Sequence, residues 1–434
     1  MERVPREPGP GADSGHDLTV GHETGQRAGR QRASRQEAGQ RANGEGADYL
    51  VEPVWDDLPP DPQLDAKNPR KGRGAVSNAA SRYVKTQSVR EDDGWAQAGV
   101  VRGNAVVTEG EEPVRTQLLV DRTQRLIVTN SSPDIPFDQS INPYKGCEHG
   151  CVYCYARPTH AFLDLSPGLD FETKIFRKAQ PRQHLLQELA RPSYRCSQIA
   201  MGTNTDPYQP LERSQRVTRE ILETLLEHKH PVSIVTKSKM VLRDLDLLQE
   251  FAAQDLVHVN ISVTTMSNDL KTRLEPRTAS PAARLRTIAE LRAAGVPTGA
   301  MVAPVIPFIN DHELESIVEA VAAAGAQFVS YILLRLPLEV APMFREWLSV
   351  HYPGQAKRVM AAVQSSRGGQ DYRAQWHKRM VGEGPFAELL KARFAAISRK
   401  LNLGDTRPTL RTDLFTPPPR PGKGAPNDRQ MRLF

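Results

Sequence analysis

The sequence predicts an α/β protein whose centre is a partial (β/α)6 barrel, because short strand-like runs alternate with longer helical stretches. The runs are rich in β-branched residues, and each amphipathic stretch between them is long enough for the crossover helix that parallel strands need. Polar residues gather directly after the runs, and barrel enzymes carry their sites on the loops at the carboxyl ends of the strands. A doubly wound sheet also fits the alternation, but the positions of the polar residues favour the barrel.

The predicted barrel covers residues 138–336. Its strands are expected at 138–143, 198–203, 232–237, 257–264, 298–305 and 327–334. Its helices are expected at 178–190, 213–228, 240–252, 281–294 and 311–324. The polar groups that follow strands are at 147–154, 204–206, 237–238, 264–265 and 310–311.

The N-terminal residues are expected to form an extension that begins with a disordered segment. Residues 1–80 form this extension and a linker, since the first 46 lack aromatic residues and cannot bury enough apolar surface. The basic stretch near residue 71 suggests a linker or a segment that lies across the body. Residues 81–137 are expected to pack on the barrel with a half-buried antiparallel strand pair, because RTQLLVDRTQRLIVTNS alternates apolar and polar residues.

The C-terminal part predicts a helical extension followed by a tail. Residues 337–406 are expected to hold helices at 338–350, 354–366 and 384–398. Residues 407–434 hold six prolines and no periodicity, which indicates an extended basic tail.

Charge and composition narrow the class of protein. The net charge is +6, of which the tail of residues 407–434 supplies +4 from six basic and two acidic residues. The basic balance is therefore weak evidence for nucleic-acid binding. No signal peptide and no run of eighteen apolar residues is found, so no membrane segment is expected. Only four cysteines occur, three of them within eight residues, which favours reduced thiols in a cytoplasmic protein.

The central motif is NPYKGCEHGCVYCYAR, in which Cys147, Cys151 and Cys154 follow a Cys-x3-Cys-x2-Cys spacing. Thiolates are the usual ligands of iron–sulfur clusters, and three of them leave one iron of a cubane open for chemistry. The glycines at positions 146 and 150 let the loop wrap tightly. A structural zinc site that adds His149 or His160 is the alternative, although structural zinc usually takes two ligands from each of two loops.

The spacing, with Tyr153 before the last cysteine, resembles that of the radical S-adenosylmethionine (radical SAM) superfamily. The resemblance implies a [4Fe–4S] cluster on Cys147, Cys151 and Cys154 whose open iron chelates S-adenosylmethionine. It also implies an outside electron donor such as flavodoxin or ferredoxin. The protein would supply orientation and exclusion of water.

Further stretches, including CVYCYARPTHAF and GTNTDPYQPLE, resemble the spore photoproduct lyase-like branch, often labelled DNA-repair-photolyase-like, over residues 115–335. The resemblance implies S-adenosylmethionine contacts from a set of residues at strand ends: Tyr153 near the adenine, Asn204, Lys237 and Ser262, with Val302 and Pro304 lining the adenine pocket. Alternatively, residues 204–206 form an Asx-turn, Lys237 is a solvated lysine and Ser262 is an ordinary strand residue.

One position departs from this branch. Spore photoproduct lyases place a hydrogen-donating cysteine at the end of the second strand, where this chain has Gly202. Cys196 comes before that strand and is expected at the other end of the barrel, as a small buried apolar residue. Reversal of a thymine dimer by that route is therefore not expected.

Two features suggest partners. The chain ends QMRLF, which resembles the peptide that docks bacterial repair and replication proteins on the DNA polymerase sliding clamp. A loop around Trp376 carries Arg367, Arg373, Lys378 and Arg379, and it mixes charge and aromaticity as single-strand binders do. A solvated helix–loop face is the alternative.

The predicted function is that of a radical SAM enzyme acting on a nucleic acid or nucleotide-containing substrate. The alternatives are a radical SAM enzyme that modifies a protein or a metabolite, and a non-catalytic zinc-stabilised binding module.

Overall fold

A computed structural model describes residues 71–83, 100–102, 105–107, 115–404 and 407–420. These residues belong to one compact unit, Pro60–Phe434. A short antiparallel hairpin of β1 (Val100–Arg102) and β2 (Ala105–Val107) is described by itself. No helix in the described ranges is long and apolar enough to cross a bilayer.

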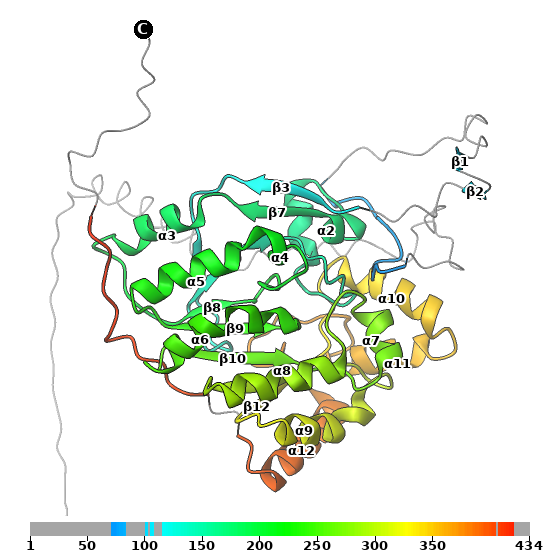
Figure 1. The fold of residues 1–434 in the computed structure, drawn as a ribbon. Coiled ribbons are helices and arrows are strands. Elements are labelled where there is room, and N and C mark those ends of the chain that lie inside the picture. The colour runs from blue at the N-terminus through cyan, green and yellow to red at the C-terminus, as the bar shows by residue number, and fades with distance from the viewer. Residues whose placement is uncertain (1–70, 84–99, 103–104, 108–114, 405–406, 421–434) are drawn as a thin grey trace, which may run out of the picture. The chain divides into compact units, whose positions relative to one another are not determined.

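The main sheet has seven strands in the order β12–β11–β10–β9–β8–β5–β4. Every pairing from β5 to β12 is parallel, and β4 adds an antiparallel edge to β5. Six parallel strands in chain order make an open barrel, so the predicted partial (β/α)6 architecture is confirmed (Figure 1). The strands are β4 (Ile127–Thr129), β5 (Gln139–Ile141), β8 (Ile199–Met201), β9 (Val232–Thr236), β10 (Val257–Ser262), β11 (Thr298–Val305) and β12 (Val329–Leu333).

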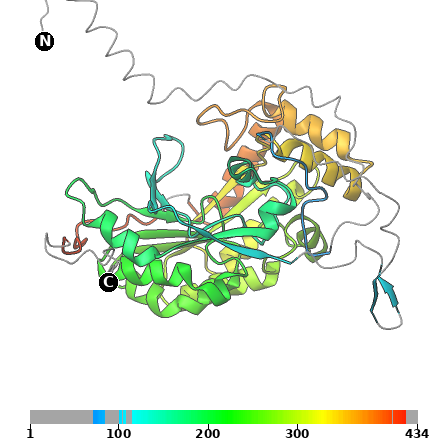
Figure 2. The same ribbon diagram turned by 90° about the horizontal axis from the view of Figure 1, so that it is seen from above.

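A layer of crossover helices lies along the outer face of this sheet (Figure 2). Serines at 238, 267 and 280 accept a backbone N–H and so cap η3, α7 and α8. All six residues of β10 are buried because both faces of a barrel strand are covered. The helices and 3-10 turns are α3 (Pro181–Leu189), α4 (Glu212–Gln215), α5 (Val217–Glu227), η3 (Lys239–Asp244), α6 (Leu245–Ala252), α7 (Asn268–Leu274), α8 (Pro281–Ala293), η4 (Asp311–Glu313) and α9 (Leu314–Ala323).

The predicted strand pair within residues 115–131 is wrong in its pairing. β3 (Gln117–Asp121) pairs with β7 (Lys174–Lys178), and β7 also pairs with β6 (Tyr144–Lys145) in a separate three-stranded sheet. The other half of the predicted pair, β4, joins the main sheet. Alternating polarity predicts a half-exposed strand, but its partner depends on contacts far away in sequence.

The C-terminal helices form as predicted, and the first two share a core with the cysteine motif. The helices are α10 (Val340–His351), α11 (Ala356–Ser365) and α12 (Gly384–Lys400). Trp347 on α10 is fully buried and donates its indole N–H to the carbonyl of Arg273 at 3.0 Å. Val152 belongs to the same apolar cluster as Trp347, so α10 and α11 form part of the wall behind the motif, whereas α12 packs on the barrel core.

Residues 71–83, here called the N-terminal strap, lie across the body. This arrangement agrees with one of the two interpretations of the basic stretch in the sequence. Ser77 donates to Glu346 at 2.8 Å, and Arg82 pairs with Glu339. Ser81 donates to the carbonyl of Ala161 at 3.1 Å. The predicted disordered extension and linker spans residues 1–80. Residues 1–70 lie outside the described residues, whereas residues 71–80 belong to the strap.

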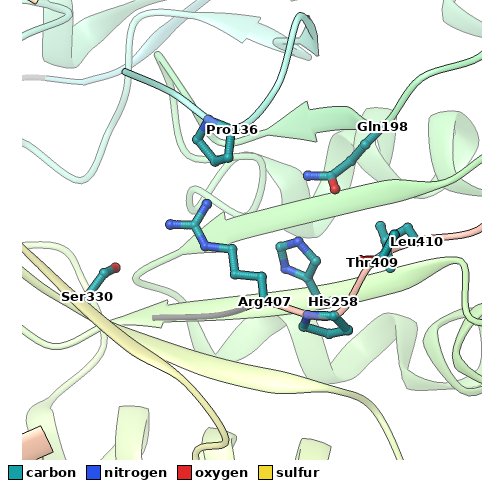
Figure 3. Close-up of a pocket in the computed structure, with 8 residues that line it drawn as sticks. Pro136, Gln198, His258, Ser330, Arg407, Thr409 and Leu410 are labelled. Carbon is teal, nitrogen blue, oxygen red and sulfur yellow. The ribbon is translucent and has the colours of Figure 1, made fainter. Parts of the chain in front are cut away.

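Residues 407–420, here called the C-terminal segment, are extended as predicted, and they are held against the amino ends of the strands. Arg411 donates its backbone N–H to Asp255 at 3.0 Å, just before β10. Phe415 packs edge-on against His230, just before β9, at 5.2 Å between ring centroids. A cavity of about 540 Å³ lies between this segment and the amino ends of the strands (Figure 3). It is lined by Pro136, Gln198, His258, Ser330, Arg407, Pro408, Thr409 and Leu410.

Candidate active site

The cysteine motif forms a loop between β6 and η2 (Arg157–Leu163), and α2 (Leu169–Thr173) lies beside it. Cys147 and Cys151 are buried, Cys154 is half-buried, and all three thiols are free. Cys147 donates its N–H to Phe171 at 2.9 Å, and Val152 donates to Leu274 at 3.1 Å. The backbone of the loop is therefore fixed on both sides by other elements.

Gly146 and Gly150 adopt φ values of +82° and +66°, as the tight loop requires. A Cβ on Gly146 would lie 2.9 Å from His160 and from Ile175, so the loop leaves no room for a side chain there. The glycines therefore allow both the turn and the close packing.

The three thiols are close enough to affect each other's ionisation. Burial raises the pKa of Cys147, and the neighbouring charges of Asp206 and Cys151 raise it further. Burial and the charge of Glu275 likewise raise the pKa of Cys151. Across the described ranges, no group of three His, Cys, Asp or Glu side chains surrounds one metal position. A cubane does not need such convergence, because its three thiolates bind different irons, and this donor set fits it.

The two histidines of the zinc alternative have other partners. The Nδ1 atom of His149 lies 3.3 Å from Asp206, and the Nε2 atom of His160 lies 3.0 Å from the carbonyl of Lys174. Burial lowers the pKa of His160.

Glu275, which follows α7, connects two of the predicted S-adenosylmethionine contacts. Its fully buried carboxylate accepts hydrogen bonds from Tyr153 and, at 2.6 Å, from Thr264, and it pairs with Arg284. The Nζ atom of Lys237 lies 3.9 Å from it. Burial alone would raise the pKa of Glu275, but Arg284 and Lys237 outweigh burial and hold it at about 2.

No sequence pattern pointed to Glu275. Its significance depends on the packing of α7 against the cysteine loop, and only the aromatic donor Tyr153 belongs to a motif. For Asp206, the sequence indicates only a place in an Asx-turn. It does accept from the N–H of Tyr208 at 2.9 Å, and it also accepts from Thr236 and from the N–H of Lys237 at 2.7 and 2.8 Å. Asp206 thus joins the turn after β8 to the end of β9.

The other predicted contacts lie at the same carboxyl end of the sheet. Ser262 is buried at the end of β10, and its carbonyl accepts from Arg284 at 2.9 Å. Val302 and Pro304 are buried on β11. Asn204 is exposed after β8, and its N–H donates to Asn142 at 3.1 Å. The structure therefore gathers Tyr153, Lys237 and Ser262 around Glu275 and Arg284, and it leaves Asn204 at the edge.

Gly202 directly follows β8 with φ of +89°, and a Cβ there would lie 2.0 Å from the carbonyl oxygen of Val235. Cys196 precedes β8, at the opposite end of the strand, as expected, but it is half-buried rather than buried. Burial raises its pKa to about 12, which makes it an inert thiol at neutral pH.

Exposed aromatic side chains lie beside the cysteine loop. Tyr155, directly after Cys154, is 42% exposed, and the guanidinium of Arg335 lies 4.2 Å from its ring centroid. Phe162 is 68% exposed and lies 5.5 Å from the ring of Tyr83 at the end of the strap. The guanidinium of Arg82 lies 4.7 Å from the ring of Tyr83.

The loop around Trp376 is less basic than its sequence indicated. Arg367 is buried and donates to the carbonyls of Leu333 and Leu334 at the end of β12. The remaining cations have acidic partners: Arg373 and Lys378 pair with Glu383, and Arg379 pairs with Asp134. Each predicted cation therefore has a structural partner, which favours the alternative of a helix–loop face. Trp376 itself is 54% exposed.

Comparison with known proteins places the chain in a family. A family model described as the radical SAM superfamily matches residues 141–321. The protein Rv2578c of Mycobacterium tuberculosis is 37% identical over 277 residues, which cover 63% of this chain and 78% of that protein. The chain belongs to the radical SAM superfamily. Enzymes of this superfamily use a [4Fe–4S] cluster and S-adenosylmethionine.

More distant matches extend the comparison. The protein MJ0683 of Methanocaldococcus jannaschii is 28% identical over 214 residues, covering 49% of this chain and 76% of that protein. Among solved structures, a spore photoproduct lyase complexed with dinucleoside spore photoproduct aligns at 16% identity with a TM-score of 0.47. That alignment covers 65% of this chain and 78% of the lyase.

Proposed function

We propose that this radical SAM enzyme holds its [4Fe–4S] cluster on Cys147, Cys151 and Cys154. The observation that supports this is the donor set: three free thiols, two buried and one half-buried, on one loop at the carboxyl end of a parallel barrel. When bound, the reduced cluster and S-adenosylmethionine supply a 5′-deoxyadenosyl radical that abstracts hydrogen from a substrate.

The chain's own residues would bind and orient S-adenosylmethionine and would exclude water from the site. Tyr153, Lys237 and Ser262 would contact S-adenosylmethionine, with Asn204 at the rim and Val302 and Pro304 along the adenine. Glu275 holds the first two through its buried carboxylate. An apolar wall that includes Val152, Leu274 and Ile306 keeps water from the loop.

The proposed substrate is a nucleic acid or a nucleotide-containing molecule. The exposed ring of Tyr155, with Arg335 beside it, supports this, together with the exposed rings of Tyr83 and Phe162. Arg82, beside Tyr83, is already paired with Glu339. Bases stack on such rings, and guanidinium groups attract phosphates. A protein or metabolite substrate would not need this combination of stacking faces and cations.

Gly202 limits which lyase reactions can be proposed. A hydrogen-donating cysteine does not fit at this position, because a Cβ at residue 202 meets the carbonyl of Val235. Any final hydrogen donor would be another group, so we propose DNA as a substrate without reversal of a thymine dimer by a thiol at residue 202.

Two partners complete the proposal. Flavodoxin or ferredoxin would reduce the cluster, as in other radical SAM enzymes. Docking on the DNA polymerase sliding clamp through residues 430–434 falls outside the part of the chain that the structure describes, and it stays a prediction.

The test of the cluster assignment is anaerobic reconstitution with iron and sulfide, followed by dithionite and S-adenosylmethionine. We expect a brown protein that releases 5′-deoxyadenosine. Cys151→Ala should lose both properties, whereas the matched control Cys196→Ala should keep both. A colourless protein that binds one zinc ion and unfolds with chelators would refute the radical function and support the zinc-stabilised module.

The substrate class is tested by fluorescence anisotropy with labelled single-stranded and duplex oligonucleotides. Tyr155→Ala and Phe162→Ala should each weaken binding by ~5-fold or more, since one stacked base contributes about 1–3 kcal/mol. Leu389→Ala is the matched control, because Leu389 is an exposed apolar residue on α12. Failure of the wild-type chain to bind any oligonucleotide would favour a protein or metabolite substrate.

A further inference from the structure

A buried ion pair lies directly behind the cysteine loop. Arg157 and Glu172 are both fully buried, and the guanidinium lies 2.5 Å from the carboxylate. Arg157 also donates from Nε to the carbonyl of Cys151 at 2.9 Å, and to the carbonyls of Pro167 and Gly168 at 3.0 Å each. The guanidinium therefore fixes the backbone of the middle cysteine as well as the chain that follows η2.

The carboxylate of Glu172 is completed by the N-terminal strap. The backbone N–H groups of Gly74 and Ala75 donate to its two oxygens at 3.1 and 2.8 Å. The guanidinium of Arg73 donates to the carbonyl of Glu172 at 2.9 Å. A buried carboxylate is stable only when hydrogen bonds and an opposite charge compensate its lost hydration, and here part of that compensation comes from a segment almost 100 residues earlier.

The strap also touches the cysteine loop directly. A Cβ on Gly74 would lie 1.7 Å from the carbonyl oxygen of Gly150, so only glycine allows the two backbones to approach so closely. A Cβ on Gly150 itself would lie 2.9 Å from the carboxylate of Glu172. Strap, loop and ion pair are thus packed in one block.

We propose that Arg157 and Glu172 are positioning residues for the iron–sulfur cluster and that the strap is an integral part of the cluster-binding structure. The strap amides hold Glu172, Glu172 orients Arg157, and Arg157 fixes the loop between Cys151 and Cys154. This inference rests on the proposed function, because it takes the three cysteines as cluster ligands. It assigns a role to residues 73–75, which precede the matched family region at 141–321.

The first test uses the full chain with Gly74→Ala. The added methyl group must displace the strap or the loop, because the contacted atom belongs to the backbone. Gly354→Ala is the matched control, since that glycine is exposed and a Cβ there meets nothing within 4 Å. The readouts are iron and sulfide per chain after anaerobic reconstitution, the rate at which visible absorbance is lost in air, and the electron paramagnetic resonance spectrum of the reduced cluster.

We expect Gly74→Ala to retain its far-UV circular dichroism and to lose the cluster in air ~10-fold faster than wild type, because removing a group that orients a metal ligand typically lowers metal affinity by about 10-fold or more. Gly354→Ala should match wild type in all readouts. Arg157→Lys, which keeps the charge and loses the fork of donors, should change the cluster spectrum and speed its loss. Glu172→Gln is a harsher change, and where it does not fold the other two variants decide.

Two outcomes separate this inference from the function on which it rests. A wild-type chain that takes up no iron would refute the cluster assignment and the positioning role with it. A wild-type chain that holds its cluster, with Gly74→Ala and Arg157→Lys equal to it in iron content, decay rate and spectrum, would overturn the positioning role alone.

Discussion

Replacing Glu275 by Gln should destabilise the protein strongly, because this carboxylate balances a buried guanidinium. Glu275 is fully buried and its partner Arg284 is 2% exposed. Gln has the same shape, and its oxygen can still accept from Tyr153 and Thr264. Its NH2 group replaces the oxygen that accepts from Arg284, so the negative charge and that hydrogen bond are lost together. Leaving one member of a buried ion pair without its partner costs about 3–5 kcal/mol. We expect the lower end of that range, since Lys237 is half-exposed and can move into solvent.

The assay is equilibrium urea unfolding, followed by circular dichroism under anaerobic conditions. Arg284→Met and the double variant Glu275→Gln/Arg284→Met complete a double-mutant cycle. The double variant should lose less stability than the sum of the single losses, because neither charge is then left buried alone. A loss below ~1 kcal/mol for Glu275→Gln, or additive losses across the cycle, would refute the proposed charge balance.

Three further predictions test other parts of the molecule. Truncation before residue 407 should lower the thermal midpoint, whereas truncation after residue 420 should leave it unchanged, since the segment between them covers the amino ends of the strands. Burial and the charge of Arg407 lower the pKa of His258 to about 4, so stability should fall as the pH drops from about 6.5 to about 4, where only the unfolded chain takes up the proton. His258→Gln should reduce the slope of that part of the urea–pH profile, and His230, whose pKa burial also lowers to about 4, contributes to the slope that remains. Gly202→Cys should fold poorly or unfold at lower temperature, because its Cβ would meet the carbonyl of Val235.

Each of these predictions has a result that would contradict it. Equal thermal midpoints for the two truncations would show that the C-terminal segment contributes nothing to the fold. An unchanged pH profile for His258→Gln would place the titration on another group. A Gly202→Cys chain as stable as wild type would show that β8 and β9 can separate, and it would reopen the route that uses a thiol at this position.

Several features could be predicted from the sequence because their physical cause is local. Alternation of β-branched and amphipathic runs predicted the six parallel strands to within two residues at each end. The spacing of Cys147, Cys151 and Cys154, with glycines between them, predicted one loop that carries three thiols. Lys237 and Ser262 lie near the ends of two predicted strands. Their positions in the sequence were therefore enough to expect both at the same end of the barrel as the cysteines.

Other features depended on contacts between distant segments. The alternating run at 115–131 predicted strands but not their partners, because β3 and β4 join different sheets. The cations around Trp376 looked like a binding surface until their acidic partners, such as Glu383 and Asp134, were found in the fold. Charge in a sequence shows how many cations exist, and only the folded chain shows which of them are neutralised.

The fold class, the radical SAM resemblance and the cysteine loop could all be predicted from the sequence, because periodicity and spacing arise from neighbouring residues. The folded chain was needed to show that Glu275 joins Tyr153 to Lys237, and that Glu172 holds the N-terminal strap against the cysteine loop. A buried carboxylate has no local signature. Its effect comes from the cations and amides that folding brings to it from more than one region of the chain, where little water remains to screen their interaction.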